Sequence, residues 1–411
     1  MQIGFFDIER DRRSVLRMWQ EVGWLDRSSE KDCKAFDHFV QAGPGMVARQ
    51  DGEAECLALS AAGTLRYLQS EVRLAGITGV TTSLIGRQHG LASTVTARLV
   101  AHCAQQGAQV AMLGIFDQGY YDRLGFGTGA YCHRLYVSPE HLTVPLPDRS
   151  VCRFTVDDWE ELHRCRVERT TRHGFVTFDS EEIMRGEMLW SKNGGGLGFR
   201  DADGRVTHFL WYQADDLESG PFRLPALCYS NYGQFIELLG IIRSLKDQVR
   251  LVSFSEPPGI QLQDLLDRPF RNHAKTTGSK YANRMEAYAA SQVRICDLPG
   301  CVSAVRLTCE PVRFNLRLSD PIEQFLDDDQ AWRGIAGDYI ITLGPESTAE
   351  VGSADDLPTL TASVGAFTRL WLGVQPATGL AATDSLAGPE DLLQTLDDAI
   401  RLPTPRWDWM F

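Results

Sequence analysis

The sequence predicts an α/β and α+β protein that is divided into three domains. Its 411 residues are too many for one ordinary hydrophobic core, and strand-like apolar runs alternate with helix-periodic ones. Two prolines break the pattern at residues 144–149, and from about Ser291 the pattern shifts to alternating strands. We therefore expect domains at residues 1–148, 149–290 and 291–411.

The first domain contains a unit of strand, helix and strand. A β-rich run at residues 77–82 is followed by a glycine-containing turn and a helix. Four apolar residues of this helix lie four apart and share one face: Leu91, Val95, Leu99 and Cys103. Residues 110–116 form a continuous apolar run of strand length, which is typical of a strand covered on both faces. This order suggests a nucleotide-type site.

The second domain is expected to combine strands with one or two helices. Helical patterns occupy residues 157–166 and 235–245. The glycine-rich residues 193–198 and the stretch 201–204 predict turns between β-rich segments, as in hairpins.

The third domain is expected to be α+β. Alternating patterns predict strands at residues 302–309, 314–318 and 338–343. Helices are expected to follow at residues 358–372 and 389–402.

The composition narrows the classes of partner. With 43% hydrophobic and 23% charged residues, the chain has the composition of a soluble globular protein. The formal charge of −13 argues against a nucleic acid or an anionic membrane as main partner and favours a cationic one. Residues 291–411 hold 18 acidic residues against 8 arginines and contribute −10 of this charge. No stretch approaches 18 apolar residues and the start does not fit a signal peptide, so we expect a cytoplasmic protein without membrane insertion.

The cysteines and acidic clusters do not predict a metal site. Ten cysteines are scattered without a CxxC pair, which indicates reduced, mostly buried thiols. The acidic run at residues 327–329 lacks the ligand spacing of a calcium loop and is interpreted as a solvated turn.

The strongest local signal is a hexapeptide between the first strand and the helix. It consists of Arg87, Gln88, His89, Gly90, Leu91 and Ala92. Gly90 lets the backbone approach an anion closely, and free N–H groups at a helix N-terminus bind a pyrophosphate. Arg87 adds positive charge. These six residues are therefore predicted to bind the phosphates of a cofactor.

A tyrosine-containing turn at residues 118–126 follows the second strand. With the hexapeptide, it resembles the signature of GNAT acetyltransferases, in which a tyrosine ahead of a Gly-Phe pair lies near the sulfur of coenzyme A. The spacing to Gly125 favours Tyr121 over Tyr120 for this role.

Over its whole length the sequence resembles a more specific family, the Eis-type (enhanced intracellular survival) acetyltransferases. The matching runs are residues 76–80, 87–91, 119–127, 370–373, 377–386 and 407–411. The resemblance implies two tandem GNAT-like domains, the second without a cofactor site, followed by a sterol-carrier-protein-like domain. It also implies acetyl-CoA as co-substrate and a homo-oligomer, often a hexamer.

The resemblance also implies a mechanism. In the family a terminal carboxylate is the general base and a tyrosine the general acid, and these roles fall to Phe411 and Tyr121. A carboxylate can hold a cationic amine and relay its proton. Backbone groups around Val80 and Thr82 are implied to pair with the pantetheine arm and to polarise the thioester. The apolar end at residues 407–411 is expected to be docked, because exposing it to water is unfavourable.

Asp117 keeps two interpretations, whereas His89 and two tryptophans are given one each. Asp117 either helps to hold the substrate amine or is an exposed loop acid. His89 is assigned to the cofactor rather than to base chemistry. Trp190 and Trp211 are interpreted as core packing. The loop has fewer arginines than is usual in the family, which predicts weaker binding of the phosphates.

The function predicted from these residues is acetyl transfer to a primary amine. A cationic small molecule, either aminoglycoside-like or a polyamine, is favoured slightly over a protein lysine. Transfer of a longer acyl group is one alternative, because protein N-myristoyltransferases also use a terminal carboxylate. The other is a lipid-binding protein whose acetyltransferase site is vestigial.

Overall fold

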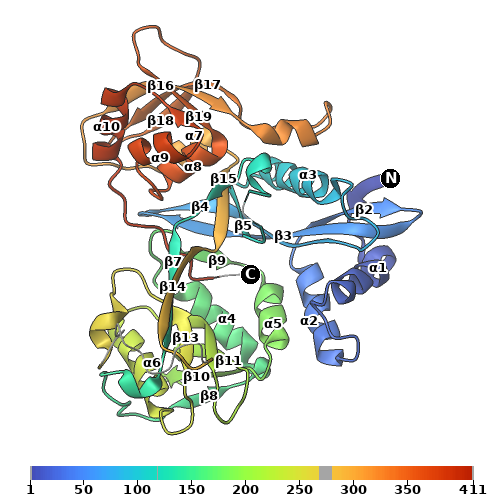
Figure 1. The fold of residues 1–411 in the computed structure, drawn as a ribbon, viewed down its shortest axis with the longest axis vertical. Helices are drawn as coiled ribbons and strands as arrows, with labels where there is room; N and C mark the ends of the chain where they lie inside the picture. Colours follow the sequence, from blue (N-terminus) through green and yellow to red (C-terminus); the bar gives the residue numbers. More distant parts are fainter. Residues whose placement is uncertain (1, 118, 268–279, 410–411) are drawn as a thin grey trace.

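The computed structural model describes residues 2–117, 119–267 and 280–409. Within these residues the chain forms three β-sheets and ten α-helices, which agrees with the mixed α/β class predicted from the sequence. Figure 1 shows the three sheets in separate lobes, with the first sheet in the middle. In the described residues no helix is long and apolar enough to span a membrane.

The first sheet has the strand order β1-β2-β3-β4-β5-β15-β6, and β9 pairs with β3. Its strands are β1 (Gln2–Phe5), β2 (Gly45–Gln50), β3 (Glu53–Tyr67), β4 (Ser70–Thr82), β5 (Val110–Gly114), β6 (Gly127–Thr128), β9 (Val176–Phe178) and β15 (Ser291–Ile295). The helices with it are α1 (Ile8–Glu21), α2 (Glu30–Gln41), α3 (Leu91–Gln105) and the 3₁₀ turn η1 (Asp122–Leu124). The predicted strand, helix and strand are confirmed as β4, α3 and β5.

The second sheet has the order β14-β7-β13-β12-β11-β10-β8. Its strands are β7 (Tyr131–Val137), β8 (Cys152–Phe154), β10 (Gly195–Arg200), β11 (Val206–Ala214), β12 (Phe222–Cys228), β13 (Val252–Ser255) and β14 (Arg284–Ala289). Its helices are α4 (Trp159–Glu168), α5 (Glu181–Trp190) and α6 (Tyr232–Ser244), with short 3₁₀ turns η2 (Pro139–His141), η3 (Val156–Asp158) and η4 (Leu262–Leu265).

The glycine-rich residues 193–198 are mostly strand rather than turn. β10 begins at Gly195, so this part of the turn prediction was wrong. A Cβ on Gly198 would lie 2.3 Å from the carbonyl oxygen of His208, and one on Gly196 would lie 2.8 Å from Cβ of Phe154. The glycines therefore permit close approach of neighbouring strands, whereas the hairpin turn at residues 201–204 is confirmed.

The third sheet has the order β18-β17-β16-β19-β20. Its strands are β16 (Val312–Ser319), β17 (Gly337–Leu343), β18 (Thr348–Val351), β19 (Thr359–Ser363) and β20 (Leu386–Ala387). Its helices are α7 (Leu298–Ser303), α8 (Val364–Trp371), α9 (Ala377–Thr383) and α10 (Glu390–Ala399), with the 3₁₀ turn η5 (Pro321–Phe325).

Two of the predicted elements in this third part of the chain were wrong. The strand expected at residues 302–309 is the end of α7 and a loop; Asp297 caps this helix by accepting from the Gly300 N–H. The helix expected at residues 358–372 is divided into β19 and α8. Ser363 starts α8 because its side chain accepts from the Ala366 N–H.

The sheets exchange strands across the predicted domain boundaries. β7 belongs to the second sheet, whereas β9 and β15 complete the first. β15 lies antiparallel between β5 and β6, so a strand from residues 291–295 is built into the sheet formed mainly by residues 2–128. The domain limits, the second GNAT-like domain and the sterol-carrier-like third domain stay predictions.

A buried ion pair joins the first and third lobes. Arg294 of β15 donates from Nη2 to Oδ2 of Asp320 at 2.6 Å, and both side chains are fully buried. A second guanidinium nitrogen donates to the carbonyl of Leu124 in η1. Asp320 also accepts from the N–H groups of Ile322 (3.2 Å) and Ile335 (3.0 Å). This pair therefore connects β15, η1 and the loop ahead of β17.

Replacing Asp320 with Asn is expected to destabilise the protein. The change leaves the buried charge of Arg294 uncompensated, which costs about 3–5 kcal/mol. Urea unfolding would measure the loss. Asp338→Asn is the matched control: Asp338 pairs with Arg317 on the surface, where both side chains are more than half exposed, and its loss costs about 1 kcal/mol or less. Equal effects of the two substitutions would contradict the prediction.

Candidate active site

The first sheet opens between β4 and β5. These strands pair in parallel only as far as Ile77 and Leu113. Beyond this point, residues 78–82 and 114–116 line one cavity of about 1050 Å³. The edge of β4 that faces β5 therefore has backbone groups free of ladder partners, and such groups can hydrogen-bond an extended amide-containing chain.

A bulge in β4 shapes this edge. Thr78 pairs with Leu59 and Thr81 with Leu57, so two residues of β4, Gly79 and Val80, face a single residue of β3. Gly79 has a φ of 61°. A Cβ at this position would also lie 3.0 Å from the side chain of Leu59. The bulge thus requires glycine and ends the regular pairing where the cavity begins.

The N-terminus of α3 closes the other end of the cavity. Gly90 is its N-cap with a φ of 72°, and no side chain caps the helix. Gly90, Leu91 and Ala92 line the cavity, so the unpaired N–H groups of the first turn are available to an anion.

The remaining predicted cofactor residues divide between the cavity and the surface. Val80, Thr82, Arg87 and Gln88 line the cavity. His89 is exposed and is not among the lining residues. The structure thus brings together seven of the eight predicted cofactor residues, and their binding role stays a prediction.

Arg123 is a cavity residue that the sequence analysis missed. Its guanidinium lies 4.4 Å from the centre of the Tyr120 ring, and its Nε donates to the Tyr120 carbonyl at 2.9 Å. With Arg87 it gives the cavity two guanidinium groups. Arg123 therefore adds positive charge to the cavity from the tyrosine turn, whereas residues 87–92 contribute only Arg87. Its position in the tyrosine turn was the available signal.

Tyr121 lies in the wall of the same cavity and is 6% exposed. Its carbonyl accepts from the N–H groups of Leu124 (2.9 Å) and Phe126 (3.3 Å), which closes the turn. Burial raises the pKa of the Tyr121 phenol above its usual value. The phenol therefore keeps its proton at neutral pH and can act as a donor. Asp117 is exposed and does not line this cavity.

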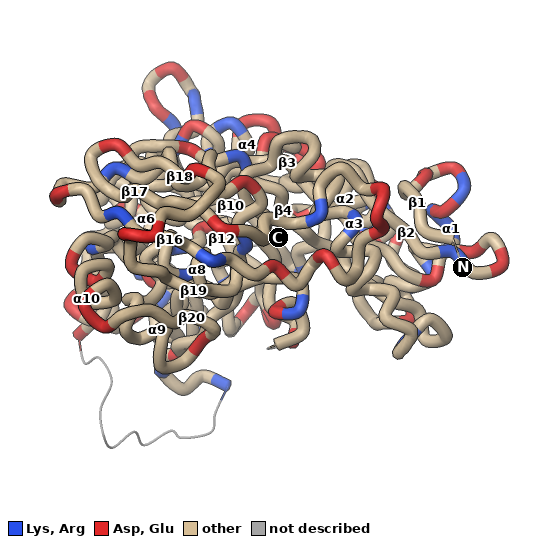
Figure 2. Tube along the Cα trace, turned by 90° about the horizontal axis from the view of Figure 1, so that it is seen from above, with Lys and Arg blue, Asp and Glu red and all other residues tan. Residues whose placement is uncertain are grey.

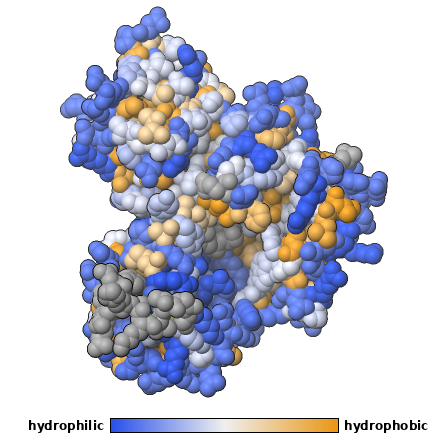
Figure 3. All heavy atoms as spheres, viewed as in Figure 1, coloured by the Kyte–Doolittle hydropathy of each residue, from blue (hydrophilic) through white to orange (hydrophobic). Residues whose placement is uncertain are grey.

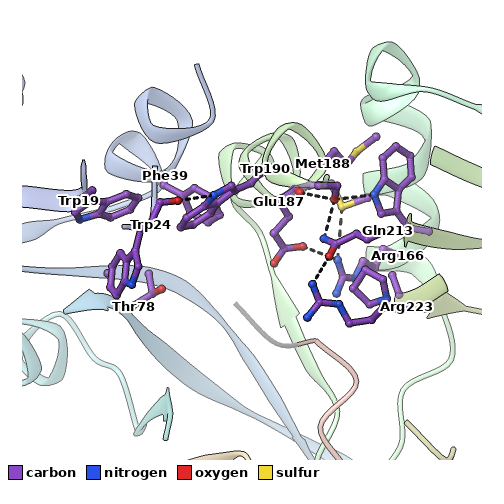
Figure 4. Close-up of a pocket in the computed structure, with 16 residues that line it drawn as sticks. Trp19, Trp24, Phe39, Thr78, Arg166, Glu187, Met188, Trp190, Gln213 and Arg223 are labelled. Carbon is purple, nitrogen blue, oxygen red and sulfur yellow. Dashed lines mark hydrogen bonds and ion pairs between the residues drawn. The ribbon is translucent and has the colours of Figure 1, made fainter. Parts of the chain in front are cut away.

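A second cavity, of about 490 Å³, adjoins the first (Figure 4). Trp24, Thr78 and Gly79 line both cavities. Figure 4 shows Trp19, Trp24 and Phe39 on one side and Arg166, Gln213 and Arg223 on the other. The second cavity therefore lies between the first and second lobes, where Figure 3 shows a hollow with hydrophobic residues along its wall.

Aromatic side chains form one wall of this second cavity. Trp19 and Trp190 are stacked with ring centres 5.7 Å apart, and Trp190 Nε1 donates to the Trp24 carbonyl at 3.2 Å. Trp190 and Trp211 were interpreted as core packing, but both also line the cavity. The sequence could not show this, because α1, the loop after it and α5 meet only in the fold.

An ion pair lies in the opposite wall. Arg166 Nη1 donates to Glu187 Oε2 at 2.9 Å, and Trp409 Nε1 donates to Glu187 Oε1 at 2.8 Å. Burial raises the pKa of Glu187, and the two hydrogen bonds oppose this shift. Burial also lowers the pKa of Arg166.

The end of the described chain is docked between α4 and α5 of the second lobe and β9 of the first sheet. Trp407 and Trp409 are buried, as predicted, and the Arg166 guanidinium lies 3.5 Å from the Trp409 ring centre. Asp408 accepts from Arg169 at 2.6 Å and from the Val176 N–H at 3.1 Å. Met410 and Phe411 lie outside the described residues, so the predicted role of the Phe411 carboxylate stays a prediction.

A known domain family matches the part of the chain that holds the first of these cavities. Residues 9–129 match the model of the acetyltransferase (GNAT) domain family. This part of the chain is a GNAT acetyltransferase domain. The protein is accordingly an acetyltransferase, and GNAT domains generally use acetyl-CoA. The comparison with curated proteins found no match to this sequence.

Solved structures share the fold of the whole chain. One is a protein of Enterococcus faecalis described as a probable N-acyltransferase, with 16% identity and a TM-score of 0.77 over 100% of this chain and 99% of that one. A GCN5-related N-acetyltransferase of Kribbella flavida has 18% identity and a TM-score of 0.75, over 100% and 98% of the two chains. Eis1 of Mycobacterium abscessus has 15% identity and a TM-score of 0.76, with 100% of both chains covered.

Gly90→Ala is expected to weaken acetyl-CoA binding several-fold. A Cβ is strained at a positive φ by roughly 1–2 kcal/mol, and relief of this strain would turn the first N–H groups of α3 away from the phosphates. Isothermal titration with acetyl-CoA measures the effect. Gly52→Ala is the control, because Gly52 has a φ of 86° in an exposed turn and open space around its Cβ position. Equal affinities in the two variants would contradict the assignment.

Proposed function

We propose that this protein transfers an acetyl group from acetyl-CoA to a primary amine. The observation that supports the proposal best is the junction of the two cavities at Trp24, Thr78 and Gly79. A thioester held beside β4 would present its carbonyl at this junction. An acceptor amine in the aromatic cavity would reach this carbonyl from the other side. The amine could therefore attack the thioester directly, without a covalent enzyme intermediate.

The first cavity suits acetyl-CoA. The N-terminus of α3 and the guanidinium groups of Arg87 and Arg123 would bind the pyrophosphate. The free edge of β4 around Val80 and Thr82 would pair with the amides of pantetheine. A backbone N–H on this edge would also polarise the thioester carbonyl.

In the reaction the neutral amine attacks the thioester carbonyl, a C–N bond forms and the C–S bond breaks. The Phe411 carboxylate is proposed to remove one proton of the acceptor ammonium before the attack, and Tyr121 to protonate the departing thiolate. The second proton, which the nitrogen loses as the amide forms, would return to the Tyr121 phenolate. The buried phenol is suited to donation because it is protonated at neutral pH. The docking of Trp407 and Trp409 supports the placement of the chain end near the second cavity.

We further propose that the protein is cytoplasmic, that it forms a homo-oligomer of hexameric size, and that Asp117 contributes to amine binding. An aminoglycoside-like amine, a polyamine and a protein lysine all remain candidate acceptors.

Tyr121→Phe is expected to lower kcat roughly 100-fold or more while acetyl-CoA affinity is kept, because general acid catalysis is lost. Product mass spectrometry would follow transfer to a panel of amines. Tyr288→Phe, on the exposed face of β14, is the control. A larger loss in Tyr120→Phe than in Tyr121→Phe would move the role to Tyr120.

A chain that lacks Phe411 is expected to lose transfer and keep acetyl-CoA binding. Asp408→Asn should cause a smaller loss of the same kind, because it weakens the ionic hydrogen bonds with Arg169 that hold the docked segment. Full activity of the shortened chain would contradict the proposed base. Transfer from longer acyl-CoAs but not from acetyl-CoA would favour the longer-chain alternative.

A further inference from the structure

Arg223 is a cationic residue of the second cavity that the proposed mechanism does not use. It lies on β12, borders this cavity and a smaller one beside residues 405–408, and is exposed. Among the described residues, no carboxylate forms an ion pair with it. Its one hydrogen bond there runs from Nη2 to Gln213 Oε1, at 2.6 Å (Figure 4). Four of its five N–H donors are therefore free to bind a ligand.

A chain of hydrogen bonds holds this guanidinium in place. Gln213 Nε2 donates to Ser191 Oγ at 3.0 Å, which fixes the side-chain amide that accepts from Arg223. Ser191 Oγ also accepts from Trp211 Nε1 at 3.0 Å and donates to the Glu187 carbonyl at 2.9 Å. Ser191 is 1% exposed. Arg223 is thus supported from a buried residue at the end of α5, unlike a freely moving surface arginine.

The charges of the cavity favour an acidic group on the ligand. The ionisable residues of its lining are Arg166, Glu187 and Arg223. Among these described residues Arg166 and Glu187 neutralise each other in an ion pair, which leaves the positive charge of Arg223. The Phe411 carboxylate of the proposed mechanism would serve the acceptor ammonium at the other end of the cavity. A polyamine would meet this charge with repulsion at one end of the cavity. A carboxylate would instead accept two parallel N–H donors in the usual fork geometry.

The aromatic wall of the second cavity also constrains the shape of the ligand. Trp24 and Trp190 present flat apolar surfaces between the thioester junction and the side of the cavity that carries Arg223 (Figure 4). A ligand with a flat apolar body fits this wall.

We propose that the acceptor is a primary amine with an aromatic or apolar body and a carboxylate, and that Arg223 binds this carboxylate. The inference rests on the proposed function and names its acceptor class. The amine lies toward Thr78 and Gly79, and the acid lies toward β12. Arg223 is then a specificity-determining residue that selects acid-bearing amines over polycations.

The test compares amines that differ only in the carboxylate, with acetyl-CoA as donor and the full chain as enzyme. Suitable pairs are tryptophan with tryptamine and 4-(aminomethyl)benzoate with benzylamine. We expect a higher kcat/KM for the acid of at least one pair. Arg223→Met should lower that value roughly 10- to 100-fold, mainly through KM, because a charged hydrogen bond of about 1.5–3 kcal/mol is lost. The neutral amine should change little, and Arg223→Lys should restore part of the loss.

Arg205→Met is the matched control, because Arg205 is exposed in the turn before β11 and lines none of the three cavities described above. Two results would overturn the inference. One is an equal preference of the unchanged protein for both members of each pair. The other is an equal loss for both members in Arg223→Met, which would show that Arg223 serves the enzyme's own carboxylates.

Equilibrium binding separates this inference from the proposed function. Isothermal titration of the same acids into the protein reports binding without chemistry. Binding of an acid that depends on Arg223, with no transfer to any amine, would uphold the acid site and reject the transferase mechanism. Transfer to amines, together with binding of the acids that does not depend on Arg223, would uphold the transferase mechanism and reject the acid site.

Discussion

The buried pair of Arg294 and Asp320 is the constraint on which the position of the candidate catalytic turn depends. Arg294 belongs to a strand that closes the first sheet, yet it also holds the carbonyl of Leu124, three residues after Tyr121. Both charges are fully buried, so the pair is stable only while each keeps its partner. The turn also packs closely on the third lobe, since a Cβ on Gly125 would lie 2.4 Å from Val364. The third lobe therefore holds the candidate catalytic turn in place.

The second lobe contributes in a different way. It supplies Glu187, Trp190 and Arg223 to the second cavity and holds the docked end of the chain through Arg169 and Asp408. The first cavity is lined by residues of the first lobe, whereas the second cavity is lined by residues of both lobes. In the proposed mechanism, donor and acceptor recognition are thus divided between two parts of the chain. The relative placement of these parts then decides whether the amine reaches the thioester.

Seven of the eight residues predicted to bind the cofactor line the first cavity, because they lie close together in the sequence. Residues 87–92 lie in one turn, and Tyr121 follows directly after the next strand of the unit, so spacing alone brings them to one edge of the sheet. The acceptor wall joins Trp24, Trp190 and Arg223, which are distant in sequence and have no shared motif. The wrong elements had a similar cause. Short apolar runs such as residues 302–309 fit strand and helix equally well, and the capping by Asp297 decided the outcome.

The formal charge of the whole chain favoured a cationic partner, but most of the acidic residues that cause it lie away from the second cavity. Most of the excess acid belongs to residues 291–411, and α10 carries several of these side chains on the surface (Figure 2). Exposed charges at this distance are screened by salt and act mainly on solubility and encounter. Among the described residues that line the second cavity, by contrast, one guanidinium is in excess. A protein with a formal charge of −13 can therefore select an acidic ligand, because selection depends on the few charges that the ligand contacts.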